Sequence, residues 1–294
     1  MKNLKQLRSR IKVIADIKKT TKAMQLIAAS KLQHLKQALE ASNMSMLSSF
    51  DAIEICLTLY KYLDITPETY IENLLLNPQY NVSDKKLILL IASDQGLCGT
   101  YNHNLFKFTN NKFKAISDNP NSETIELFTY GKKAAEFSLR NFKNLPQEHF
   151  IATEKNLTKN AQELTTKIFD KFISGNFTEI VIYSNHFKNM LVQECTEQLL
   201  IKKLHKLYNL SRVTFIHEGK NLLDKAFKYY IGTTIYHNLL FAKAGEESAR
   251  VISMDSASKN ANKMIDQLTL TMNRARQSIV TKELIEITTS AEAL

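Results

Sequence analysis

Residues 4–40 read LKQLRSRIKVIADIKKTTKAMQLIAASKLQHLKQALE, and this stretch decides the fold class. Its apolar and small residues recur in alternating steps of three and four, which is the spacing of a coiled-coil seam with small slips. The seam runs through Leu4, Leu7, Ile11, Ile14, Ile17, Thr21, Met24, Ala28, Leu32, Leu35 and Leu39. The helical pattern continues less regularly to residue 57 and ends before Pro67. About 55 residues give a helix of roughly 80 Å, too long for a domain of this size to cover, so it needs a partner helix.

The other end of the chain supplies such a partner. No glycine precedes Gly96, no proline precedes Pro67, and residues 246–294 contain neither, so the usual helix breakers are absent from both ends. Helical spacing begins at residue 221, with Gly232 and Gly245 as the weak points. A stripe of mostly small residues follows: Ala257, Ala261, Met264, Leu268, Thr271, Ala275 and Ile279. Two such helices around one globular unit most simply form an antiparallel coiled coil, which implies mechanical or scaffolding work.

The middle of the chain, about residues 67–216, changes its hydrophobic period. Short apolar runs at 86–92, 124–129 and 179–184 predict buried strands, and 212–217 is a weaker fourth. Helical stretches are expected near 102–117, 131–143, 157–174 and 190–207. Alternating strands and helices predict a Rossmann-like α/β domain with a mostly parallel sheet. The predicted division is an N-terminal coiled-coil helix (1–63), a central α/β domain (67–217) and a C-terminal coiled-coil helix (219–294).

Composition and charge exclude several classes of protein. The longest apolar run, residues 87–92, is far short of the roughly 20 residues of a membrane span, and the start of the chain has no signal-peptide pattern. We therefore expect a cytosolic chain, or one attached to a membrane only through its partners. The three cysteines are scattered without CxxC spacing, which speaks against a zinc cluster.

Nearly all of the net charge of +10 lies in residues 1–36, which hold ten basic residues and one acid, Asp16. Such a basic helix is expected to bind nucleic acid, anionic lipid or an acidic protein surface, unless it is simply a solvated face. The patch around Lys18, Lys22 and Met24 has no aromatic residue before Phe50, so stacking on bases is not available to it. A protein acceptor is at least as good an interpretation as nucleic acid.

The segment Ser93–Gly99 (SDQGLCG) follows the first predicted strand and opens a helix, where doubly wound folds bind phosphate groups. It matches neither GxGxxG nor GxxxxGK[ST], so a tight turn that needs the backbone freedom of Gly96 and Gly99 is the favoured interpretation. Cys98, with His103 nearby in sequence, is favoured as a structural cysteine over a nucleophile. We predict no nucleotide, cofactor, metal or catalytic site in this chain.

Three segments together resemble the gamma subunit of the rotary F-type ATP synthase, of the bacterial type. The first runs from Ile17 to Leu32 (IKKTTKAMQLIAASKL), the second is Ser93–Gly99, and the third extends from Leu268 through NRARQ at 273–277 to Ile287. Their order and positions match that family along nearly the whole chain. Gln95 stands where the family commonly has arginine, and Thr288 and Thr289 stand where glycines often occur.

The resemblance implies a non-catalytic rotor shaft that couples proton-driven rotation to ATP synthesis or hydrolysis at the beta subunits. Its expected partners are the alpha and beta subunits, the epsilon subunit and the membrane c-ring, with no nucleic acid. It also implies a peripheral location on the cytoplasmic face of the bacterial inner membrane. The implied contacts with alpha and beta are Lys18, Lys22, Met24, Arg274, Arg276, Gln277, Thr281 and Glu283, and the last residues would sit in an apolar sleeve. From the residues alone, the C-terminal tip is either a thin, smooth end or a fraying terminus, and the nucleic-acid binder and the nucleotide-using enzyme remain as rival hypotheses.

Overall fold

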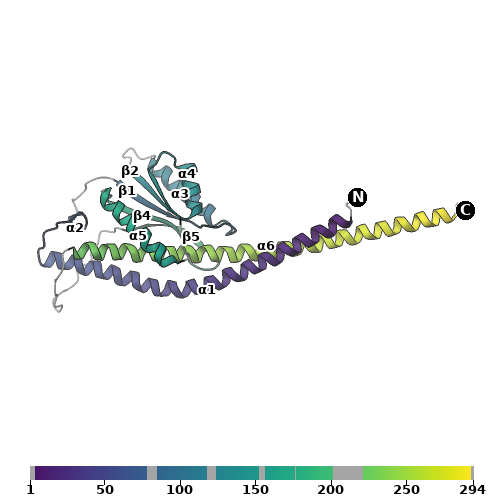
Figure 1. Ribbon diagram of the computed structural model, residues 1–294, viewed down its shortest axis with the longest axis horizontal. Helices are drawn as coiled ribbons and strands as arrows, with labels where there is room; N and C mark the ends of the chain where they lie inside the picture. Colours follow the sequence, from purple (N-terminus) through teal and green to yellow (C-terminus); the bar gives the residue numbers. More distant parts are fainter. Residues whose placement is uncertain are drawn as a thin grey trace. The chain divides into compact units, whose positions relative to one another are not determined.

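The computed structural model describes residues 4–77, 85–117, 124–151, 156–175, 177–200 and 221–292. It contains two long helices, α1 (Leu4–Tyr62) and α6 (Leu222–Glu292), which confirm the two predicted terminal helices (Figure 1). The weaker fourth strand expected at 212–217 lies outside the described residues. Among the residues described, no helix combines the length and the hydropathy that crossing a bilayer requires.

The chain divides into two compact units. Residues 1–30 and 250–294 form one unit, here called the helix-pair unit, and residues 31–249 form the other, here called the α/β unit. Each long helix therefore contributes one part to each unit. The predicted domain limits near residues 63, 67, 217 and 219 stay a prediction.

The α/β unit contains a five-stranded sheet in the order β3-β2-β1-β4-β5. Its strands are β1 (Lys85–Ile91), β2 (Thr124–Tyr130), β3 (Gln147–Phe150), β4 (Glu179–Phe187) and β5 (Gln193–Leu199). The first four run parallel, and β5 pairs with β4 in the antiparallel direction, from Phe187–Gln193 at the hairpin end to Val181–Leu199. The sheet is therefore mostly parallel, as the alternation of strands and helices predicted.

The helix expected at 190–207 is wrong over residues 193–199, which form the edge strand β5, and residues 201–207 lie outside the described residues. A turn at Asn189, whose Oδ1 accepts hydrogen bonds from the backbone N–H groups of Leu191 and Val192, sends the chain back along β4. Pairing with β4 then decides the conformation of QECTEQL, a sequence with little strand propensity of its own. Strand β3 and the short helix α2 (Tyr70–Leu76) were not predicted from the sequence.

Alternate residues of the central strands enter two separate cores, as expected for side chains that alternate across a sheet. Leu87, Leu89 and Ile91 of β1 face a core that α5 (Leu157–Ser174), α6 and α1 complete. Ile88 and Leu90 face the opposite core, which α3 (Tyr101–Ser117) and α4 (Lys132–Asn141) cover. The α/β unit is thus a three-layer structure in which the helices α1 and α6 belong to one outer layer (Figure 1).

Candidate functional site

In the helix-pair unit, the inward face of α1 follows a strict heptad. Apart from Ala15, its least exposed residues are separated by three and four residues in regular alternation: Leu4, Leu7, Ile11, Ile14, Lys18, Thr21, Gln25 and Ala28. The predicted seam placed Ile17 and Met24 inside, which is wrong, since their side chains are 50% and 36% exposed. The regular heptad keeps one face of α1 toward α6, and it therefore puts polar Lys18 and Gln25 at inward positions.

These two polar residues join the helices directly. Lys18 Nζ donates to Asn262 Oδ1 at 2.7 Å, and Gln25 Nε2 donates to Asp255 Oδ1 at 3.1 Å. Seven residues forward along α1 thus correspond to seven residues backward along α6, which shows that the two segments are antiparallel. A hydrogen bond from Lys259 is the main reason that the pKa of Asp255 lies below its usual value, so the carboxylate is the acceptor at neutral pH. Polar residues at seam positions fix the register of a helix pair.

The inward face of α6 in this unit is also regular: Val251, Met254, Ser258, Ala261, Ile265, Leu268, Met272, Ala275 and Ile279. The predicted stripe was right for Ala261, Leu268, Ala275 and Ile279, which lie on this face. It was wrong for Met264, which is 55% exposed, and for Thr271, which is also exposed. The inward positions belong to the residues that follow them, Ile265 and Met272. Counting strict heptads from Leu4 and Leu7 would have found the inward positions of α1.

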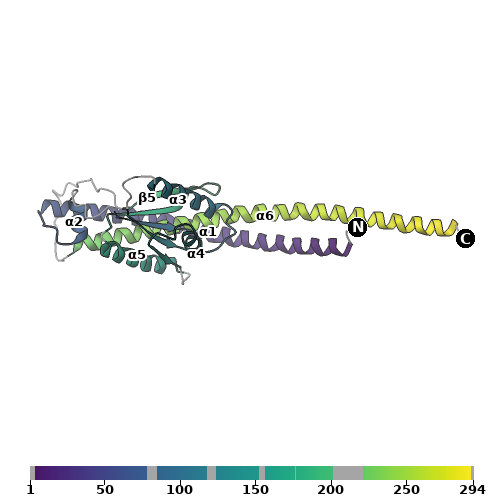
Figure 2. The ribbon, with the colours of Figure 1, turned by 90° about the horizontal axis from the view of Figure 1, so that it is seen from above.

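The C-terminal part of α6 continues beyond its pairing with α1. The register that joins Lys18 to Asn262 brings Leu4, fourteen residues earlier, opposite Arg276. Residues 277–292 of α6 therefore extend past the first described residue of α1, as Figures 1 and 2 show. This extension exposes large apolar side chains, namely Val280, Leu284, Ile285 and Ile287, each about half to two-thirds accessible.

The predicted partner contacts all lie in the helix-pair unit. Lys22, Met24, Arg274, Arg276, Gln277, Thr281 and Glu283 are exposed, whereas Lys18 is half-buried in the seam. Lys22 Nζ donates to Gln25 Oε1 at 3.0 Å, and Thr281 Oγ1 donates to the Gln277 carbonyl one turn earlier at 2.9 Å. Their role in binding alpha and beta subunits stays a prediction.

The loop Ser93–Gly99 lies at the carboxyl end of β1, where a phosphate would be bound in a nucleotide-binding fold. Here Asp94 Oδ1 accepts from the Lys132 N–H at 3.1 Å, and the Ser93 carbonyl accepts from the Lys133 N–H at 3.1 Å. The protein's own oxygens therefore occupy the first donors of α4, the groups that would otherwise bind an anion. The loop itself leads into α3, so this geometry closes the start of the neighbouring helix α4 to an anion.

The glycines of this region have unequal roles. Gly99 has a φ of 58°, as the predicted turn requires, whereas a Cβ on Gly96 would meet no atom within 4 Å and Gly96 has no positive φ. The glycine that the sequence analysis missed is Gly131, at the end of β2, with a φ of 95°. A Cβ there would lie 2.3 Å from the Ala92 carbonyl oxygen. Cys98 is buried, with its sulfur 3.4 Å from Asn102 Nδ2, and its surroundings fit the structural role.

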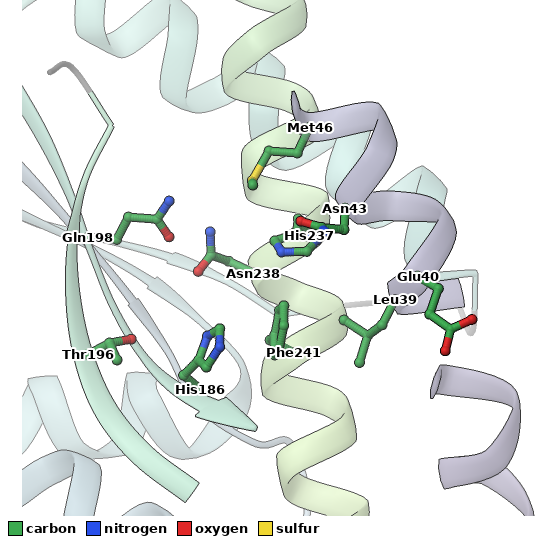
Figure 3. A pocket seen from close by; sticks show the side chains of 10 residues that line it. All are labelled: Leu39, Glu40, Asn43, Met46, His186, Thr196, Gln198, His237, Asn238 and Phe241. Carbon is green, nitrogen blue, oxygen red and sulfur yellow. The ribbon is translucent and has the colours of Figure 1, made fainter. Parts of the chain in front are cut away.

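A cavity of about 640 Å³ lies between β4, β5, α1 and α6 in the α/β unit (Figure 3). His186 and His237 both pack on the ring of Phe241, with ring centroids 4.0 and 4.7 Å away. Burial lowers the pKa of His237 to about 4, so its imidazole is neutral at pH 7. His237 Nδ1 lies 2.8 Å from Ser42 Oγ, so this ring links α6 to α1. The wall of this cavity therefore includes a contact that joins α1 to α6.

A second cavity, of about 690 Å³, lies at the carboxyl ends of β1 and β2. Asp94, Glu246 and Glu247 contribute three carboxylates to its wall. Lys243 Nζ lies 2.8 Å from Glu246 Oε2, and Lys31 Nζ lies 3.9 Å from Glu247 Oε1. Lys132 also lines the cavity, so its wall carries three lysines beside the three carboxylates, and two of the lysines lie near its own glutamates.

Comparisons with known proteins agree with this architecture. The chain is 33% identical over 305 residues to the ATP synthase gamma chain of Rickettsia felis and 34% identical over 301 residues to that of Rickettsia bellii strain RML369-C. Both alignments cover 100% of each chain.

Solved structures share the fold. A chain of the Euglena gracilis mitochondrial ATP synthase, in a structure of OSCP, F1 and c-ring, aligns with a TM-score of 0.66 at 13% identity. That alignment covers 99% of this chain and 94% of that one. A chain of the Tetrahymena thermophila central stalk and c-ring aligns with a TM-score of 0.58 at 23% identity over 81% of this chain and 99% of that one. The family model described as ATP synthase matches residues 3–294, and the chain therefore belongs to the ATP synthase family as a gamma chain.

Proposed function

We propose that this chain is the central rotor shaft of a proton-translocating F-type ATP synthase. It couples rotation of the membrane ring to ATP synthesis or hydrolysis at the beta subunits of an alpha3-beta3 hexamer, and it has no active site of its own. The full-length relation to gamma chains is the observation that carries the proposal. The long helices and the carboxylate that occupies the start of α4 support a mechanical role over the nucleotide-using enzyme.

Within this role, the helix-pair unit is the part that enters the hexamer. Its α1 segment exposes Lys5, Arg8, Arg10, Lys12, Lys19 and Lys22, a basic surface suited to acidic loops of the catalytic subunits. The extension 277–292 exposes apolar side chains that suit an apolar sleeve. Its regular helical conformation to Glu292 supports a formed tip over a fraying terminus.

The partners of the α/β unit are the epsilon subunit and the c-ring. The complex containing this chain is placed on the cytoplasmic face of a bacterial inner membrane, which the resemblance to Rickettsia gamma chains supports. The chain contacts the membrane only through those partners.

Reconstitution tests the proposal. Purified chain is mixed with alpha and beta subunits, and ATP hydrolysis and rotation are measured, with alpha and beta alone as the control. We expect a stable complex in which the chain rotates during hydrolysis. Failure to co-assemble would contradict the rotor role. Steeply salt-dependent, sequence-independent binding of DNA or RNA by the chain would favour the nucleic-acid rival instead.

Met24→Lys tests the predicted contact with beta. The Met24 side chain is 36% exposed outside the seam, so we expect little change in stability or assembly. A new positive charge at a surface fitted to the hexamer is expected to lower proton pumping per ATP hydrolysed, measured in the complete complex with its membrane ring in sealed vesicles. Met44→Lys, which adds the same charge at a 73% exposed methionine of α1 in the α/β unit, is the control. Unchanged coupling efficiency would argue against the contact assigned to Met24.

A further inference from the structure

Helix α6 contains two glycines, Gly232 and Gly245. Glycine destabilises the interior of a helix, so the proposed rotor function alone does not explain either of them. In the structure each meets a side chain from the layers around the sheet. A Cβ on Gly245 would lie 3.1 Å from Tyr101 Cε2, and a Cβ on Gly232 would lie 3.3 Å from Thr165 Cγ2. Glycine at these places allows close approach of another element to the helix.

Tyr101 makes the more specific of the two contacts. It is the first residue of α3, it is buried, and its hydroxyl donates to the Ala242 carbonyl of α6 at 2.6 Å. Burial is the main reason that its pKa lies well above the usual value, so the hydroxyl keeps its proton and remains a donor. The hydrogen bond and the ring contact at Gly245 fall within one turn of α6.

The backbone of Tyr101 is itself held by the sheet. Asn185 Nδ2 of β4 donates to the Tyr101 carbonyl at 3.1 Å, and Cys195 Sγ of β5 donates to Asn185 Oδ1 at 3.1 Å. A continuous chain of contacts therefore runs from β5 through β4 and Tyr101 to the backbone of α6.

We propose that Tyr101 is a positioning residue that locks the sheet onto α6, with Gly245 as the notch that admits its ring. The contact adds a directional attachment to the apolar core that already packs α6 against the sheet, and its mechanical meaning rests on the proposed rotor function. Ser248 Oγ, which donates to the Met190 carbonyl at 2.9 Å, attaches the β4–β5 hairpin to the same helix. Loss of the Tyr101 bond is therefore expected to loosen the attachment without separating the elements.

Hydrogen exchange in the isolated full-length chain gives the first test. Tyr101→Phe keeps the ring and removes the bond to α6. Tyr70→Phe is the matched control, since Tyr70 also donates to a backbone carbonyl, that of Phe177 at 2.8 Å, but not to α6. We expect about fivefold faster exchange of the amides of residues 242–248 in Tyr101→Phe, and no such change in Tyr70→Phe, at a similar loss of melting temperature. Unchanged exchange in this segment, or equal changes in both variants, would overturn the lock.

Gly245→Ala gives a second test, because the proposed contact and helix propensity predict opposite results for this substitution. Alanine favours a helix over glycine, so a glycine without a packing role would give slower exchange of residues 242–248 and a higher melting temperature when replaced. The lock predicts faster exchange and a lower melting temperature, because the added methyl group displaces the Tyr101 ring. The result expected from propensity alone would contradict the proposal.

Rotation in the complex with alpha and beta subunits tests the mechanical role. A bead is attached to Lys143→Cys, an exposed position just after α4, and its angular fluctuation is recorded while the rotor is paused. We expect wider fluctuation in Tyr101→Phe than in Tyr70→Phe. Equal fluctuation would overturn the role of Tyr101 in holding the sheet to α6. A parent chain that does not assemble would instead count against the rotor function, and the exchange results on the isolated chain would still decide the contact.

Discussion

At the scale of single residues, the backbone at the carboxyl end of the sheet decides which glycines are required. Gly131 combines a positive φ with a carbonyl oxygen in the space that a side chain would need. Gly96, in the motif that drew attention in the sequence, has open space around it. Of the two glycines in that motif only Gly99 has a positive φ, and Gly131 lies outside it, because φ depends on the path of each strand-to-helix connection.

Substitution of these two glycines should separate their roles. We expect Gly131→Ala to lower the free energy of unfolding by about 2 kcal/mol or more, because strained φ and a backbone collision add together. Gly96→Ala should change it by less than about 0.5 kcal/mol. Urea unfolding followed by circular dichroism measures both, and similar losses in the two variants would contradict the geometry described for the turn.

Glu72 ties three helices of the α/β unit together. Its carboxylate accepts from the Tyr60 hydroxyl of α1 at 2.7 Å and from the Glu68 and Thr69 N–H groups at 2.8 and 3.1 Å. Thr69, the N-cap of α2, also donates through Oγ1 to Asp224 Oδ1 of α6 at 2.7 Å. Burial alone would raise the pKa of Glu72, but the three hydrogen bonds outweigh it and the net pKa is lowered.

A lowered pKa in the folded state means that Glu72 stabilises the protein above the unfolded pKa, near 4.5, and that this contribution is lost as the pH falls through the lower folded value. Glu72→Gln cannot accept all three bonds, and we expect it to cost about 1–3 kcal/mol at pH 7. The difference from the parent chain should shrink below about pH 4. Thermal unfolding across pH measures it, with exposed Glu68→Gln as the control. A difference that stays constant with pH would contradict the role given to the carboxylate.

At the scale of elements, the regular heptad of α1 determines which of its residues face α6. The inward face keeps its alternating spacing even where this places Lys18 and Gln25 inside and leaves Ile17 outside. Placing a hydrogen-bonded polar pair in the seam costs less free energy than interrupting the heptad. The uninterrupted heptad keeps every later contact between the two helices in register.

Lysine substitutions at neighbouring positions of α1 test this register. Ile14→Lys places a charge at the seam, and we expect it to destabilise the helix-pair unit by about 2 kcal/mol. Ile17→Lys adds the same charge at a side chain that is 50% exposed and should change stability by less than about 0.5 kcal/mol. Proteolysis or hydrogen exchange of residues 250–292 in the full chain reports the effect. A larger loss for Ile17→Lys would support the slipped seam instead.

The sequence was sufficient for the two long helices and three of the strands, because periodicity and the absence of breakers are local properties. It was insufficient for β5, whose conformation depends on pairing with β4, and for the seam near Lys18, where hydrophobicity favoured Ile17. Of the candidate site, the exposed positions from Arg274 to Glu283 were named through family resemblance, and their role in partner binding stays a prediction. The Tyr101 contact could not be found, because its partners Ala242 and Gly245 are remote in sequence.

At the scale of the whole molecule, charge is distributed very unevenly. Residues 1–36 account for nearly all of the net charge of +10, and from Lys5 to Lys36 the lysines and arginines outside the seam are exposed. Long-range attraction raises association rates with an acidic partner and is screened by salt. The uneven charge therefore favours encounters through the α1 end of the chain.

This distribution makes the rate of assembly with alpha and beta subunits sensitive to ionic strength. We expect a severalfold lower association rate in about 0.3 M salt than in about 0.05 M salt, measured by stopped-flow fluorescence. Lys12→Gln combined with Lys19→Gln should weaken the dependence, and Lys107→Gln combined with Lys143→Gln, outside the basic segment, should leave it unchanged. A flat salt dependence for the parent chain would show that charge does not guide assembly.

The pairing of the first helix with the last also has a consequence for biosynthesis. Lys18 and Asn262 are 244 residues apart, so the ribosome completes α1 long before its partner exists. At about 5–20 residues per second, the interval lasts on the order of ten seconds or more. During translation the apolar stripe of α1 is therefore uncovered, and the nascent chain has to be kept from misfolding or aggregation until its final segment emerges.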